Sequence, residues 1–102
     1  MTDTRQLREA LIERILGGEG TASRSVRRSA FENAGLAEPL RTLVQKVAVQ
    51  GITVTDGDVV AARTSGLSED QIFEIVVCAA VGQSARQYSS ALAVLNLALR
   101  EK

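Results

Sequence analysis

The stretch from residue 72 to residue 81 is apolar except for Glu74, and it contains the chain's single cysteine, Cys78. A carboxylate in apolar surroundings has a raised pKa, so Glu74 is a candidate general acid or base; the alternative is that Glu74 lies at an interface and pairs with an arginine or a lysine. A thiol buried in such a stretch is unreactive, which makes Cys78 a small core residue. A peroxidatic Cys78 would need a nearby cation. Arg86 stands two turns further along the same predicted helix, which is too far, so another helix would have to supply the cation.

A second group of polar residues follows Gly82. Gln83, Arg86 and Tyr88 are candidate ligand-binding residues that could line a small-molecule pocket or a subunit contact. Ordinary packing and surface positions are the alternative. Because glycine lacks a side chain, Gly82 is a point at which the helix could bend or another backbone could approach closely.

The chain contains no histidine, which excludes imidazole general bases, Ser-His and Cys-His catalysis and most zinc sites. The pair Asp56 and Asp58 offers too few oxygens at the wrong spacing for a calcium loop. Helix capping by Thr55 and Asp58 explains the second aspartate without a metal. We therefore expect neither a metal nor a cofactor. A single cysteine forms no intrachain disulfide, so a reduced, cytoplasmic setting is expected.

Hydrophobic residues recur with a helical period along the chain, which predicts an all-α, single-domain bundle of about five to six helices. The longest predicted helix begins after Ser68, which forms a capping box with Gln71, and continues to about Leu99. Because its first half is apolar on nearly every side, we expect protein to surround it there. The other predicted helices cover about residues 4–16, capped by Thr4 or Asp3, then from 21 or 23 to 34, 39–50 and 55–65, and each ends at a glycine.

The second predicted helix carries three arginines, Arg24, Arg27 and Arg28. A solvated face is the first interpretation, and a site for an anion or an acidic partner is the alternative. The formal net charge is zero and aromatic residues are few, which favours the solvated face. The zero net charge also predicts no binding to nucleic acid or to a membrane surface.

We divide the chain into residues 1–20, an N-terminal helix with a glycine-rich joint, and residues 21–102, the helical domain. Apolar stripes on the first helix and on the last turns exceed what one small bundle can hide. These stripes predict a homo-oligomer with both helices at the interface; the family resemblance given below implies its size, a dimer, trimer or hexamer. The sequence contains no apolar run long enough to span a bilayer and no secretory signal pattern.

The region from Leu40 to Leu95 resembles the carboxymuconolactone decarboxylase and alkylhydroperoxidase (AhpD-like) superfamily. Three features carry the resemblance: the segment 40–48, the Gly-Leu-Ser turn at 66–68 with its acidic residues, and the alanine-rich helix that continues to Tyr88. The resemblance implies a helical domain that forms dimers, trimers or larger rings.

The redox members of that superfamily use a Cys-x-x-Cys followed by a histidine. Here the corresponding positions are residues 51–54, with Asp58 at the histidine position and Thr42 near the acidic relay residue. Both thiols and the imidazole are missing, as is the histidine associated with lactone decarboxylation. We therefore expect a protein without peroxidase or decarboxylase chemistry that acts by assembly or by binding a ligand or partner. The alternative is an enzyme with a relocated site around Cys78, Glu74, Arg86 and Tyr88; Cys78, Glu74 and Asp58 are the candidate catalytic residues.

Overall fold

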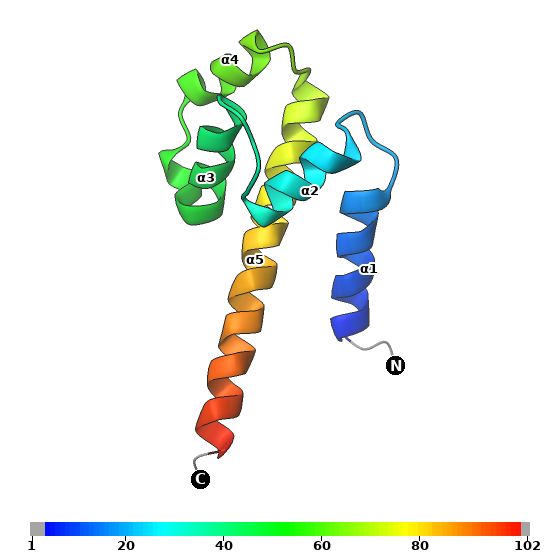
Figure 1. Ribbon diagram of the computed structural model, residues 1–102, viewed down its shortest axis with the longest axis vertical. Coiled ribbons are helices and arrows are strands. Elements are labelled where there is room, and N and C mark those ends of the chain that lie inside the picture. The colour runs from blue at the N-terminus through cyan, green and yellow to red at the C-terminus, as the bar shows by residue number, and fades with distance from the viewer. Residues whose placement is uncertain (1–3, 101–102) are drawn as a thin grey trace.

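The computed structural model describes residues 4–100, and within this range it is helical, as predicted. Figure 1 shows the shorter helices gathered around the first part of one long helix, α5. The elements in chain order are α1 (Thr4–Gly17), α2 (Arg24–Glu32), α3 (Leu40–Gln50), the short 3-10 helix η1 (Gly51–Thr53), α4 (Asp56–Thr64) and α5 (Glu69–Arg100). The proposed cap Asp3 lies outside the described residues.

The predicted capping boxes are present at α4 and α5. The Thr55 hydroxyl accepts a hydrogen bond from the backbone N–H of Asp58 at 3.2 Å, and the Asp58 carboxylate accepts one from the N–H of Thr55 at 2.9 Å. At α5, the N–H of Gln71 donates to the Ser68 hydroxyl at 3.1 Å, and the N–H of Ser68 donates to the Gln71 side chain at 2.8 Å. These bonds satisfy helix N–H groups that lack intrahelical partners, which fixes where both helices begin.

Two predicted boundaries were wrong by a few residues. Helix α2 ends at Glu32, because Asn33 adopts the left-handed conformation with φ of 54° and closes the helix before Gly35. Helix α3 begins at Leu40 rather than at Pro39, and the Glu38 carboxylate accepts a hydrogen bond from the N–H of Thr42 at 2.8 Å. The side chain of Glu38 thus caps α3.

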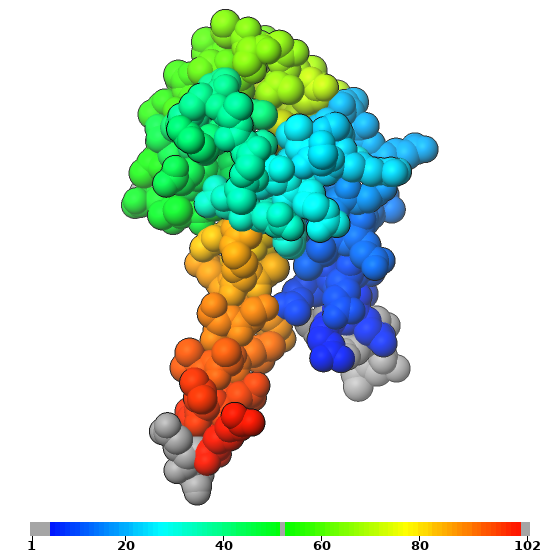
Figure 2. All heavy atoms as spheres, viewed as in Figure 1, coloured from blue at the N-terminus to red at the C-terminus, as the bar shows by residue number. Residues whose placement is uncertain are grey.

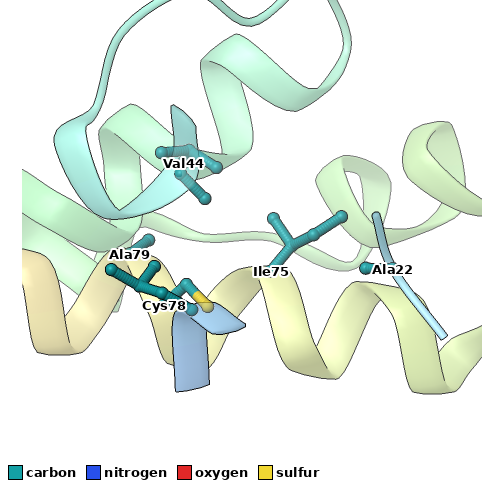
Figure 3. Close-up of a cluster of buried hydrophobic side chains, with 7 residues drawn as sticks. Ala22, Val44, Ile75, Cys78 and Ala79 are labelled. Carbon is teal, nitrogen blue, oxygen red and sulfur yellow. The ribbon is translucent and has the colours of Figure 1, made fainter. Parts of the chain in front are cut away.

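The core lies between one face of α5 and the shorter helices. Figure 3 shows Ile75 and Ala79 of α5 on the side of Val44 of α3, and the sulfur of Cys78 on the side of α1. Ala30 of α2 also belongs to this cluster. A second, smaller cluster joins α3, α4 and α5 and consists of Leu43, Ala62 and Ile72.

The expectation that protein surrounds the first half of α5 was wrong. Phe73 is 69% exposed, and Ala80 also faces solvent, whereas Ile75 and Cys78 are buried. The shorter helices therefore leave part of the apolar surface of this long helix uncovered.

The second half of α5 extends beyond the packed body. Figures 1 and 2 show the last turns of α5 extending beyond the other helices. Every residue from 87 to 100 is exposed. The radius of gyration is 15.6 Å, compared with about 13 Å for a compact chain of this length. No helix within residues 4–100 is long and apolar enough to cross a membrane.

Candidate functional site

Glu74 anchors the loop that joins α1 to α2. Its carboxylate accepts hydrogen bonds from the backbone N–H of Thr21 at 3.0 Å, the N–H of Ala22 at 3.1 Å and the Thr21 hydroxyl. These bonds favour the ionised form and lower the pKa of Glu74, the Thr21 hydroxyl having the largest effect. The expectation of a raised pKa was therefore wrong, because loop N–H groups surround the carboxylate in place of apolar side chains.

The glycine-rich joint allows this loop to approach Glu74. A Cβ atom at Gly20 would overlap Oε1 of Glu74 and lie 3.1 Å from its Cδ. Any larger residue would therefore displace the carboxylate from the loop. The joint therefore connects two helices and also packs closely against the Glu74 side chain.

Arg27 is the buried arginine of α2, with 4% of its surface exposed, while Arg24 and Arg28 are exposed. The solvated-face interpretation thus holds for the two outer arginines and was wrong for Arg27. One guanidinium nitrogen, Nη1, donates to the carbonyl of Ile15 at 3.0 Å. The Nε–H is buried without an acceptor. Among residues 4–100, no carboxylate lies within ion-pair distance of Arg27.

Cys78 is buried in the core, with 1% of its surface exposed, as its apolar surroundings predict. Its thiol donates to the same carbonyl of Ile15, with 3.6 Å between sulfur and oxygen. Burial raises the pKa of Cys78, and the nearby Arg27 opposes this effect only in part. The cation that a reactive Cys78 would need comes from α2 rather than from Arg86, but the thiol remains protonated at neutral pH.

A cavity of about 480 Å³ brings these groups together between the end of α1 and the first turns of α5. Its wall includes Arg14, Ile15, Arg27, Glu74, Val77 and Cys78. Two of the candidate catalytic residues, Glu74 and Cys78, therefore share one site. We call it the Arg27 cavity.

The candidate ligand residues Gln83, Arg86 and Tyr88 lie at two other places. Arg86 donates through Nη1 to the carbonyl of Phe31 at the end of α2, and through Nη2 to the side chain of Gln83 at 3.1 Å. These two residues thus secure the contact between α2 and α5. Tyr88 lies further along α5, where the Arg8 guanidinium stacks over its ring at 4.1 Å.

Asp58 does not line the Arg27 cavity, and its partners lie on α3 and at the start of α4. Besides capping α4, its carboxylate accepts a hydrogen bond from Lys46 of α3 at 2.8 Å. Lys46 and Thr55 lower the pKa of Asp58, with Lys46 the larger cause. These contacts hold α4 against α3. Within residues 4–100, no group of acidic or cysteine side chains is arranged to hold a metal ion.

Sequence reasoning missed the central position of Arg27. The available signal was its spacing: Arg27 stands three residues before Ala30, so both lie on the same face of α2. That face packs toward the core and the end of α1. An arginine on an apolar helix face would have indicated a buried charge.

Comparisons of the chain with family models, with curated proteins and with solved structures found no match.

Proposed function

We propose that the chain is a divergent member of the carboxymuconolactone decarboxylase and alkylhydroperoxidase superfamily that acts through homo-oligomeric assembly, without peroxidase or decarboxylase chemistry. The family proposal rests on the sequence resemblance between Leu40 and Leu95. The absence of the paired thiols and of any histidine supports the lack of family chemistry. One structural observation carries the assembly proposal: the second half of α5 exposes its apolar side chains.

The exposed residues of α5 follow a heptad spacing. Ala85, Tyr88, Leu92, Leu95 and Leu99 recur at alternating intervals of three and four, the pattern by which two helices pair along an apolar seam. Leu92, Leu95 and Leu99 are 40%, 54% and 56% exposed. No residue from 87 to 99 is charged. A second copy of the same helix suits this surface, because apolar self-pairing requires no complementary charge.

The exposed area is sufficient for such an interface. The accessible surface is 7109 Å², whereas a compact monomer of 10.9 kDa exposes about 5,600 Å². The excess of roughly 1,500 Å² exceeds the area of about 800 Å² that each partner buries in a stable interface. Beside the seam, α1 and α5 form an apolar groove of about 350 Å³ that includes Leu11, Val81 and Tyr88. Leu7 and Leu11 of α1 are also exposed, which supports including α1 in the proposed interface.

Light scattering after size-exclusion chromatography at micromolar concentration tests the proposal. We expect an oligomer mass for the unmodified chain and a monomer mass for the double variant Leu92→Glu/Leu95→Glu. The matched control is Gln87→Glu/Ser90→Glu, which adds the same charge away from the seam and should stay oligomeric. A monomer mass for the unmodified chain would contradict the assembly proposal. Peroxide turnover that Cys78→Ser abolishes would contradict the proposed lack of chemistry.

A relocated active site is the second candidate, favoured by the proximity of Cys78 and Glu74 to Arg27. Arg86 and Tyr88 contact other groups and do not line the Arg27 cavity. The rate at which iodoacetamide alkylates Cys78 separates the candidates. Slow labelling of the folded protein, with fast labelling only after unfolding, would argue against a reactive thiol.

A further inference from the structure

We infer that the Arg27 cavity binds a small organic monoanion, a carboxylate with a short apolar body, whose negative charge pairs with Arg27. This site goes beyond the proposed assembly and does not depend on it, because the cavity lies among α1, α2 and α5 of one chain.

The first argument is the unpaired charge of Arg27. Its guanidinium is almost fully buried, makes one hydrogen bond to the Ile15 carbonyl and keeps a buried Nε–H without an acceptor. A buried charge without a counterion is costly, and unsatisfied buried donors are rare in folded proteins. An anion in the adjoining cavity would supply the missing charge.

Glu74 lies close enough to interact with Arg27 through space, but its oxygens are already engaged. They accept hydrogen bonds from Thr21 and Ala22 and hold the loop before α2. Neither oxygen lies within ion-pair distance of Arg27, although the two charges interact through space. The carboxylate that would pair directly with Arg27 is therefore absent from the described residues.

The wall of the cavity indicates the chemical class of the ligand. Ile15, Val77 and Cys78 provide apolar surface, which suits an aliphatic or aromatic body. The charged residues of the wall are balanced, Arg14 and Arg27 against Glu19 and Glu74. Both glutamates would repel a multiply charged phosphate more strongly than a single carboxylate, whose one charge Arg27 can balance. A volume of about 480 Å³ leaves room for a short chain or a single ring.

Titration of the ¹⁵N-labelled full chain with hexanoate tests this inference. We expect saturable chemical-shift changes at the amides of Gly18, Val77 and Cys78 and at the Arg27 side chain. Hexanol, which has the same length and no charge, should bind about tenfold more weakly or worse, because it lacks a charge-assisted hydrogen bond. Light scattering of the same samples separates ligand binding from any change in assembly.

Three variants decide which residues bind hexanoate. Arg27→Lys keeps the charge but loses the planar donor group, and it should weaken binding about tenfold. Val77→Phe fills the cavity and leaves Arg27 in place, so it should abolish binding even if the first variant folds poorly. Arg24→Lys, on the exposed side of α2, is the matched control and should bind normally. Absent saturation, equal binding of hexanol, or undiminished binding by Val77→Phe would each overturn the inference.

Discussion

At the scale of single residues, Glu74 illustrates how one half-buried carboxylate can determine the conformation of a loop. It lies on α5, and the groups that it binds lie more than fifty positions earlier in the chain. The ionised carboxylate stabilises the folded loop because it accepts hydrogen bonds from the Thr21 hydroxyl and from two loop N–H groups. The same contacts argue against a role as a general acid at neutral pH.

The lowered pKa of Glu74 predicts how stability depends on pH. Because the folded-state pKa lies below the ordinary value of 4.5, the folded state favours the ionised carboxylate. This contribution to stability is present above that value and is lost as the pH falls through the folded-state pKa. Urea unfolding should show Glu74→Gln to be less stable than the original chain at about pH 7, with a smaller difference at about pH 3.

The control for this experiment is Glu13→Gln, on the exposed side of α1, which should leave the pH dependence unchanged. Glu38 and Asp58 also have lowered pKa values and act in the same direction in every variant. The difference between variants therefore isolates Glu74. A constant difference between about pH 3 and pH 7 would contradict the assignment.

The sequence singled out Cys78 and Glu74, but it predicted the environment of Cys78 only. For Cys78 the apolar neighbours along the helix are sufficient to predict burial. For Glu74 they are misleading, because its partners come from a loop that local periodicity does not describe. The burial of Arg27 depends likewise on how α1 ends, which is a tertiary property.

At the scale of elements, the contact between α2 and α5 depends on Gly82. A Cβ atom there would overlap the carbonyl oxygen of Phe31 and lie 2.7 Å from its carbonyl carbon and 2.9 Å from its Cα. The sequence predicted that Gly82 could admit another backbone, and the structure confirms this at the end of α2. The obstacle is the backbone of Phe31 rather than a flexible side chain. A Cβ atom at Gly82 could therefore fit only if α2 or α5 shifted as a whole.

Gly82→Ala should therefore destabilise the fold by about 1–3 kcal/mol, the usual cost of overpacking, although alanine favours helix formation. The matched control is Gly57→Ala in α4, where a Cβ atom would meet only the Thr55 hydroxyl at 3.5 Å. That variant should be neutral or slightly stabilising. Urea unfolding of both variants measures the two effects, and equal stability for both would show that the contact is not tight in solution.

The extents of the elements were largely predictable because capping residues have short-range consequences. Ser68, Gln71, Thr55 and Asp58 act within one turn, so the sequence alone locates the first residues of α4 and α5. The exposure of Phe73 was not predictable in this way. It depends on how many helices are available to cover α5.

At the scale of the whole molecule, the two halves of α5 differ in how far the rest of the chain covers them. Its first half organises the core, whereas every residue from 87 to 100 in its second half is exposed. The overall dimensions of 54 × 29 × 21 Å reflect this division. The proposed assembly would cover the exposed half, and it predicts that stability depends on protein concentration.

Removing residues 91–102 tests this division of α5. None of residues 91–100 is buried, so the shortened chain should retain the core around Ile75 and Val44, and its circular dichroism should remain helical. Binding between native chains stabilises them by mass action, so the melting temperature of the full chain should rise with concentration from about 1 to 100 μM. The shortened chain should melt at one temperature throughout this range, because the seam residues Leu92, Leu95 and Leu99 are gone. A full-length melting temperature that is independent of concentration, together with a monomer mass, would show that these leucines remain exposed to water in solution.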